Sequence, residues 1–259
     1  MAQQSWIRVP QGLFLFQRSG LGIGTNLTRP TTNGYYRSMG KRVLITGKTT
    51  KLGNLLVEHY LSQGWQVVAT VKQDEEKRND TEIDSNLLIR TWNRRSPLAA
   101  KNVLLGGINH FGGIDEAIII FPVDGENRPL HELPSAAIEA AIDGQIKSQL
   151  FMVKEVLAYF QKEKRGQLSL IRNNEGADVL PPLEAICSGS FQALSRSLFT
   201  FYQNEKVYIN SFESSTGDAK GFVDFIMKTL DEKARDQHGK MYRFHDKGVL
   251  GALGRNLRK

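Results

Sequence analysis

The segment from Gly47 to Gly53 has the residue types of a turn that could hold a phosphate group. It follows the short apolar run at 42–45, and Leu52 opens a segment with apolar residues at helical spacing. A helix that begins there presents free N–H groups and a partial positive charge to an anion. The residues predicted to bind that anion are Gly47, Lys48, Thr49, Thr50, Lys51, Leu52 and Gly53. Because only the first and last are glycines, an ordinary turn without a ligand is the alternative interpretation.

The elements around this turn alternate between strand and helix. A strand at 42–45, a helix that Gly64 ends and a strand at 65–71 form one βαβ unit. Further strands are predicted near 86–90, 117–121, 168–171, 207–212 and 241–244, and further helices near 96–105, 135–163, 183–203 and 218–233. Gly106-Gly107 is expected to interrupt or end the second helix, and Ser135 to cap the third. The pattern predicts a single α/β domain with a Rossmann-like, doubly wound parallel sheet.

Composition excludes several classes of protein. The chain has 259 residues, of which 40% are hydrophobic and 24% charged, as in soluble globular proteins. No apolar run approaches the roughly 20 residues of a membrane span, so we expect no membrane association. The single cysteine, Cys187, excludes an internal disulfide framework and a multi-cysteine metal site, and we predict no metal.

Residues 1–38 differ from the rest of the chain. They contain Arg8, Arg18, Arg29 and Arg37 and no acidic residue, and without these four the net charge of +7 falls to about +3. Such a leader resembles an organelle transit peptide, while Met39 directly before the first strand indicates an upstream extension. We therefore predict a flexible leader at 1–38, a nucleotide-binding domain at 39–259 and a cytoplasmic location, with an organelle as the alternative. With no basic block elsewhere, binding to nucleic acid is not expected.

Four stretches between residues 41 and 250 carry known sequence motifs. They are KRVLITGKTTKLG at 41–53, HFGGID at 110–115, QALSRSL at 192–198 and YINSF at 208–212. Together they resemble the short-chain dehydrogenase/reductase family. The first is similar to the TGATGxLG turn of extended and atypical members, with Thr50 in place of a glycine. The resemblance implies the Rossmann-like fold and NAD(P) binding.

The catalytic residues of that family do not carry over. It uses a Tyr-x-x-x-Lys motif, which does not occur within residues 166–203, and the two positions hold Glu184 and Ser188. The family's serine position falls at Arg172 or Asn173, and its helix asparagine position at Gln145. A buried glutamic acid could donate a proton and Arg172 could bind an anion. The alternative is that both are substitutions that followed the loss of catalysis.

The expected cofactor follows from the end of the second strand. An acid there would bind the ribose hydroxyls of NAD, but the residue is Lys72. Lys72 and Lys48 could instead meet a ribose phosphate, which favours NADP(H) over NAD(H); otherwise both are solvated lysines.

The sequence thus predicts a divergent family member that keeps the NAD(P)-binding fold and acts by binding or assembly. One alternative is an active NADPH-dependent oxidoreductase with a non-standard acid, and another is a structural subunit of a larger complex. The resemblance implies a homodimer or homotetramer that pairs the helices at 135–163 and 183–203. The apolar residues expected there are Ile138, Ile142, Phe151, Phe191, Leu194 and Phe199.

Overall fold

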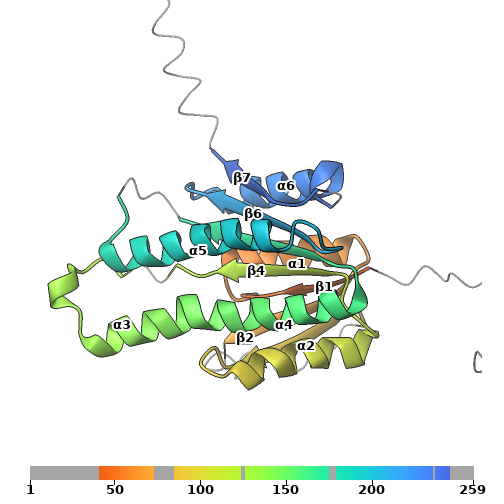
Figure 1. The fold of residues 1–259 in the computed structure, drawn as a ribbon, viewed down its shortest axis with the longest axis horizontal. Coiled ribbons are helices and arrows are strands. Elements are labelled where there is room, and N and C mark those ends of the chain that lie inside the picture. Colours follow the sequence, from red (N-terminus) through yellow and green to blue (C-terminus); the bar gives the residue numbers. More distant parts are fainter. Residues whose placement is uncertain (1–40, 73–84, 124–125, 175–178, 236, 246–259) are drawn as a thin grey trace, which may run out of the picture. The chain divides into compact units, whose positions relative to one another are not determined.

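A seven-stranded parallel sheet forms the centre of the domain (Figure 1). The computed structural model describes residues 41–72, 85–123, 126–174, 179–235 and 237–245, so the leader at 1–38 lies outside the described residues. The strands are β1 (Arg42–Ile45), β2 (Gln66–Lys72), β3 (Leu87–Trp92), β4 (Glu116–Phe121), β5 (Gln167–Asn173), β6 (Tyr208–Ser214) and β7 (Lys240–Phe244). Their order in the sheet is β3-β2-β1-β4-β5-β6-β7. The predicted doubly wound α/β fold is therefore confirmed.

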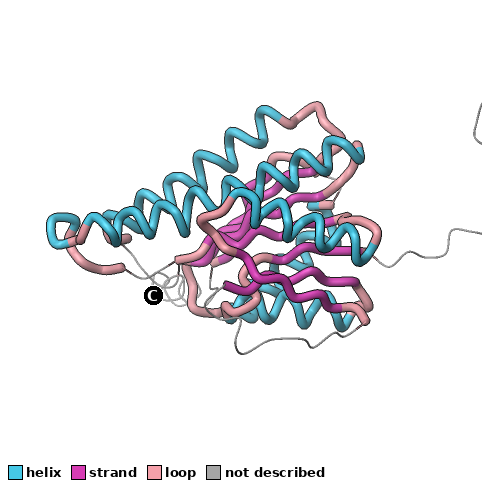
Figure 2. Tube along the Cα trace, turned by 90° about the horizontal axis from the view of Figure 1, so that it is seen from below, coloured by secondary structure: helices cyan, strands magenta, loops and turns pink. Residues whose placement is uncertain are grey.

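Helices cover both faces of this sheet (Figure 2). They are α1 (Lys51–Ser62), α2 (Pro97–Phe111), α3 (Ser135–Ala141), α4 (Ser148–Glu163), α5 (Pro182–Phe201) and α6 (Ala219–Thr229). A π-helical segment, Ile142–Lys147, joins α3 to α4, a second one, Leu230–Ala234, extends α6, and Leu130–Glu132 forms a 3₁₀ turn. The apolar cores place α2, α4 and α5 on one face of the sheet and α1 and α6 on the other.

The central strands are apolar on both sides because both faces are covered. Along β1, Leu44 belongs to the core under α2, α4 and α5, whereas Val43 and Ile45 belong to the core under α1 and α6. All six residues of β4 are buried as well. Each fully buried aliphatic side chain stabilises the domain by roughly 1.5–3 kcal/mol relative to an exposed one.

Two local predictions are wrong. Helix α2 continues through Gly106-Gly107 to Phe111, because Gly107 is buried against Val68 and a helical glycine costs only about 1 kcal/mol. Ser135 does not cap α3: the helix begins directly after Pro134, and its first turn has no side-chain cap. The chain enters this helix with Pro134 in an extended conformation, so Ser135 is already the first helical residue.

None of the described helices has the length and apolar character needed to cross a membrane. Within the same residues no group of three or more metal-ligating side chains occurs, and Cys187 is buried and not in a disulfide.

Candidate functional site

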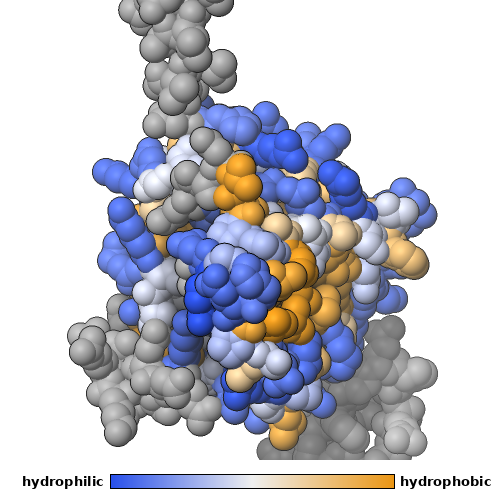
Figure 3. Space-filling view, turned by 90° about the vertical axis from the view of Figure 1, so that its left-hand side faces the viewer, coloured by the Kyte–Doolittle hydropathy of each residue, from blue (hydrophilic) through white to orange (hydrophobic). Residues whose placement is uncertain are grey.

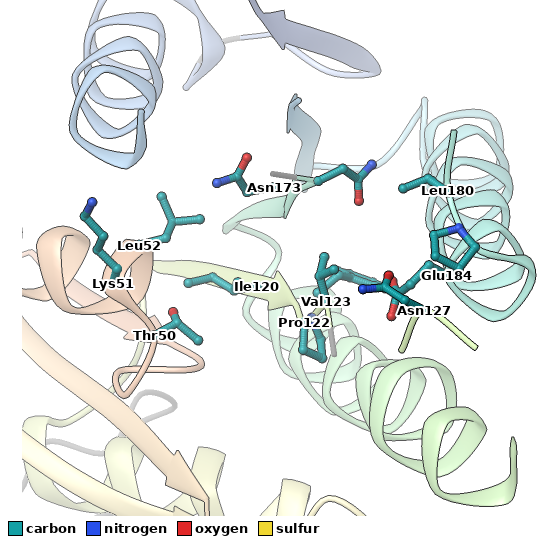
Figure 4. Close-up of a pocket in the computed structure, with 13 residues that line it drawn as sticks. Thr50, Lys51, Leu52, Ile120, Pro122, Val123, Asn127, Asn173, Leu180 and Glu184 are labelled. Carbon is teal, nitrogen blue, oxygen red and sulfur yellow. The ribbon is translucent and has the colours of Figure 1, made fainter. Parts of the chain in front are cut away.

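A cavity of about 440 Å³ lies at the carboxyl ends of the central strands. The strand order reverses between β1 and β4, and ligands of open α/β sheets bind at such a switch point. Figure 4 shows Thr50, Lys51 and Leu52 on one side of the cavity and Leu180 and Glu184 on the other. The lining combines the β1–α1 turn, the ends of β4 and β5, and the start of α5. The structure thus brings the predicted phosphate turn and the predicted acid to one cavity.

The β1–α1 turn is fixed by hydrogen bonds to strand β2. The Gly47 N–H donates to Thr70 Oγ1 at 3.1 Å, and the Lys48 N–H donates to the Thr70 carbonyl at 2.9 Å. Gly47 has a φ of +74°, which favours glycine. At Gly53 a Cβ atom would lie 2.1 Å from the Gly47 carbonyl oxygen, so both glycines that the sequence retains are required by the turn.

Thr50 is the N-cap of α1. Its Oγ1 donates to the Gly47 carbonyl at 2.8 Å and accepts from the Gly53 N–H at 3.0 Å. Its φ of −79° and ψ of 151° are ordinary extended values, so the threonine is not strained in place of the glycine. Threonine is a favoured N-cap residue, and here its hydroxyl closes the turn.

The start of α1 fits an anion. In the part of the chain that the structure describes, no acceptor bonds the N–H groups of Lys51 or Leu52, and both residues line the cavity. Lys51 is exposed at the first helical position, where a cation opposes the helix dipole. An anion at this point would satisfy the two N–H groups and offset that repulsion. The residues present therefore fit the pyrophosphate of a dinucleotide.

The predicted lysines lie near the ends of β1 and β2. Lys72 is exposed and pairs in register with Trp92 of β3, and Lys48 is half-buried in the turn. The guanidinium of Arg94 lies over the Trp92 ring at 5.6 Å from its centroid. Arg94 follows the end of β3 by two residues and does not line the cavity.

Arg172 and Glu184 form a buried ion pair beside the cavity. Arg172 Nη2 donates to Glu184 Oε2 at 2.9 Å, and the two side chains are 0% and 2% exposed. Arg172 Nε also donates to Asn174 Oδ1 at 2.7 Å, and Nη1 donates to the Pro122 carbonyl at 3.2 Å. Burial lowers the pKa of Arg172 from its ordinary value, while the charge of Glu184 acts in the opposite direction.

The other positions that the resemblance assigns to catalysis join the same network. Gln145 Nε2 donates to Glu184 Oε1 at 3.0 Å, from the π-helical segment between α3 and α4. The Asn174 amide nitrogen donates to Ser188 Oγ at 3.5 Å. Gln145, Arg172 and Glu184 are therefore joined directly by hydrogen bonds, and Ser188 joins the same buried network through Asn174. Asn173 lines the cavity nearby, and its buried Oδ1 accepts no hydrogen bond from the residues that the structure describes.

A Tyr-x-x-x-Lys sequence does occur at Tyr202–Lys206, beyond the stretch where the motif was expected. It lies in the turn between the end of α5 and the start of β6. The cavity lies at the opposite, carboxyl ends of the strands. Tyr202 and Lys206 are therefore remote from the cavity.

Comparison with known proteins agrees with this architecture. The family model described as short chain dehydrogenase matches residues 41–213. The chain is 25% identical over 136 residues to the NADP-dependent 3-hydroxy acid dehydrogenase YdfG of Shigella flexneri, and 24% identical to YdfG of Escherichia coli O6:H1. These alignments cover 52% of this chain and 55% of each relative, so the chain spans about half the length of the curated relatives it matches.

Solved structures show the same fold. The serine dehydrogenase of Escherichia coli aligns with a TM-score of 0.65 and 17% identity, covering 78% of this chain and 96% of that one. The structure of ElxO with NADP bound aligns with a TM-score of 0.69 and 16% identity, covering 82% and 99%. The sheet order, the β1–α1 turn and the family match over more than half of the residues lead to one conclusion: the chain belongs to the short-chain dehydrogenase family.

Proposed function

We propose that this protein binds NADP(H) at the β1–α1 turn and does not carry out tyrosine-dependent proton transfer. Without that proton transfer, the protein would act by binding or assembly rather than as a carbonyl reductase. The observation that carries the proposal is the buried ion pair of Arg172 and Glu184. Glu184 stands at the position that the family resemblance assigns to the catalytic tyrosine, and Arg172 is one of the two residues, with Asn173, at which it places the serine.

Reduction of a carbonyl needs an acid that gives a proton to the developing alkoxide. A carboxyl group can do this only if it is protonated and its O–H faces the substrate. Both oxygens of Glu184 instead accept hydrogen bonds, one from Arg172 and one from Gln145. Glu184 is therefore held by two protein donors rather than positioned as an acid toward a substrate.

A bound NADPH would supply a hydride, and the residues of this chain would hold its phosphates. The N–H groups of Lys51 and Leu52 and the charge of Lys51 suit the pyrophosphate. Lys48 in the turn and Lys72 at the end of β2 do not line the cavity itself, and we propose that they meet the ribose phosphate of a bound NADPH. Each charge-assisted contact would be worth about 1.5–3 kcal/mol before solvent screening. The NADP bound to the structural neighbour ElxO supports this choice of cofactor.

Titration of the full chain with NADPH and NADH tests the proposal. We expect NADPH to bind at least tenfold more tightly than NADH, and K72A to remove most of the difference. The variant K101A is the matched control, because Lys101 is an exposed lysine within helix α2 rather than at the end of strand β2. Equal affinity for the two nucleotides would contradict the assignment of the lysines.

Turnover separates this proposal from its rival, in which Glu184 acts as a non-standard acid. That rival is favoured by one observation: Glu184 lines the cavity. We expect no NADPH oxidation with a panel of aldehydes and ketones. Turnover that E184Q abolishes, while NADPH binding is retained, would establish the rival. Failure of both nucleotides to bind at millimolar concentration would favour a structural subunit.

We also propose self-association through α4 and α5. Phe191 is fully buried in the core, so it cannot contact a partner. The outer faces of these helices expose Leu150 and Ile186, at 42% and 52%. Light scattering at micromolar concentration tests the proposal, and a monomer would contradict it.

A further inference from the structure

Thr70 holds the β1–α1 turn from the neighbouring strand. The pairing of β1 with β2 ends at Ile45 and Ala69, so Thr70 is the first residue of β2 beyond that pairing. Its Oγ1 accepts from the Gly47 N–H at 3.1 Å, and its carbonyl accepts from the Lys48 N–H at 2.9 Å. One residue of β2 thus binds two consecutive residues of the turn.

The turn has no substitute for the bond to the Thr70 hydroxyl. Gly47 is buried, and Thr70 Oγ1 is the only acceptor that the described part of the chain offers to its N–H. The Gly47 carbonyl, by contrast, accepts from both the N–H and the hydroxyl of Thr50. A buried N–H without an acceptor is costly, so loss of the Thr70 hydroxyl would force Gly47 to move.

A movement of Gly47 would reach the start of α1. Thr50 Oγ1 donates to the Gly47 carbonyl at 2.8 Å and accepts from the Gly53 N–H at 3.0 Å, so one hydroxyl joins Gly47 to the first turn of the helix. The two N–H groups at the start of α1 that suit a pyrophosphate belong to the same turn. A binding site needs such groups held within about 0.5 Å of the productive geometry. Hydrogen bonds therefore connect the Thr70 hydroxyl to the proposed phosphate site.

Thr70 itself is too deeply buried to contact a ligand. Figure 3 shows the surface at the end of the domain where α5 begins, which is also the end at which the parallel strands finish. Only 1% of Thr70 is exposed, so it contributes almost nothing to that surface, and it does not line the cavity. Any effect of its hydroxyl on nucleotide binding must therefore pass through Gly47 and the turn.

We infer that Thr70 is a positioning residue for the dinucleotide: its hydroxyl holds the β1–α1 turn in the conformation that receives the pyrophosphate. The inference rests on the proposed function, in which this turn binds NADP(H). NADPH and NADH share the pyrophosphate and differ in the ribose phosphate, so Thr70 should act equally on both. Lys72, which we propose to meet the ribose phosphate, should act on NADPH alone. The two residues of β2 thus have separable effects.

Titration of three variants of the full chain tests the inference. T70V has nearly the same shape without the hydroxyl, and we expect it to weaken NADPH and NADH by a similar factor of at least five. The ratio of the two affinities should stay within twofold of the parent ratio. T70S keeps a hydroxyl acceptor and should bind both nucleotides within twofold of the parent. T229V makes the same change at a buried threonine of α6 outside the cavity lining, and this control should leave both affinities unchanged.

Amide hydrogen exchange of the nucleotide-free protein gives a second measurement. In T70V the Gly47 amide should exchange at least tenfold faster than in the parent, because it has lost its acceptor, whereas in T70S it should stay protected. The Lys48 amide should stay protected in both variants, since its acceptor is a main-chain carbonyl. Unchanged protection of Gly47 in T70V would overturn the inference. If T70V does not fold, T70A removes the same hydroxyl and carries the same expectations.

Three results of the titrations would overturn the inference: a T70V variant that binds both nucleotides like the parent, a loss confined to NADPH, or a T70S variant as weak as T70V. A T229V variant as weak as T70V would also overturn it, because lost stability alone would then explain the effect. The proposed function fails in a different measurement, the titration of the parent. A parent that binds neither nucleotide refutes both, whereas a parent that binds NADPH beside an unaffected T70V refutes the inference alone.

Discussion

Arg172 and Glu184 approach within 2.9 Å at the end of β5 and the start of α5, and both are almost completely withdrawn from water. Each side chain stabilises the buried charge of the other. Loss of one partner leaves a buried charge, whereas loss of both leaves a neutral space. A single substitution that restores a family-like residue at either position is therefore expected to destabilise the fold.

The first prediction concerns this pair. R172M leaves Glu184 buried without its guanidinium, so we expect a loss of about 3–5 kcal/mol in the free energy of unfolding. R172M/E184Q should recover a large part of that loss, because the remaining amide is neutral. Urea denaturation measures both. R243M is the control: the Arg243 side chain is 52% exposed where it meets Glu213, so its loss should cost below about 1 kcal/mol.

Lys51 gives a prediction in which stability and binding change in opposite directions. Removal of its charge from the first turn of α1 should stabilise the nucleotide-free protein by about 0.3–1 kcal/mol. The same K51A variant should bind NADPH several-fold more weakly, because the charge no longer faces the pyrophosphate. Thermal melts with and without NADPH report both effects.

Lys220 provides the matched control for this experiment. It is an exposed lysine in the first turn of α6 and does not line the cavity. K220A should also stabilise the nucleotide-free protein, but leave NADPH affinity unchanged. If K51A and K220A behave alike toward NADPH, Lys51 has no part in binding the nucleotide.

Asp115 gives a prediction about pH. Burial opposes its ionisation, but hydrogen bonds and charge from Arg42 outweigh this and hold the pKa of Asp115 below its ordinary value. The carboxylate therefore stabilises the fold above the unfolded-state pKa of about 3.9, and this contribution is lost as pH falls through the folded-state pKa. D115N should lower stability by about 1.5–3 kcal/mol at pH 7.

The difference between parent and D115N should shrink as the pH falls below about 4, as seen in urea denaturation at several pH values. D224N is the control, since Asp224 is exposed on α6 and has no ion pair among the described residues. A difference in unfolding free energy between parent and D115N that stays constant down to pH 2.5 would contradict the stabilising role assigned to the Asp115 carboxylate.

Glu116 gives the last prediction. It is buried, accepts from Arg235 Nε at 2.6 Å and accepts from the Tyr60 hydroxyl at 2.9 Å. Y60F removes one neutral donor and should cost about 0.5–1.5 kcal/mol. R235M should cost about 3–5 kcal/mol, because it leaves the carboxylate without a charged partner. Adding E116Q to R235M should restore part of the stability, and equal effects of Y60F and R235M would contradict the argument.

The fold could be predicted because its signals are local and repeated. The apolar run at 117–121 has no alternation, which is typical of a strand covered on both faces, and β4 is such a strand. The family resemblance also indicated which positions meet. It assigned Gln145, Glu184, Ser188 and either Arg172 or Asn173 to catalytic positions, and Gln145, Arg172, Glu184 and Ser188 belong to one hydrogen-bond network, in which Asn174 links Ser188 to Arg172.

The partners of those side chains could not be predicted, because they depend on side-chain directions in three dimensions. The family resemblance placed Glu184 and Arg172 at catalytic positions, but it did not predict their mutual ion pair or the engagement of both carboxylate oxygens. The same holds for Thr50, where a missing glycine suggested strain and the structure shows a cap. The prediction that Gly106-Gly107 would interrupt or end the helix was wrong, because packing against the sheet outweighs the low helix propensity of glycine.

The strand order also governs how the chain must fold as it is synthesised. Among the described strands β1 is made first, and it ends in the middle of the sheet, between β2 and β4. Its partners on one side begin at Gln66, but those on the other begin only at Glu116. Until β4 has been made, Val43, Leu44 and Ile45 present an open, fully apolar strand edge, which is the kind of surface that aggregates. The strand that is completely buried in the finished sheet is thus the strand whose apolar edge stays unpaired, and open to aggregation, until β4 has been made.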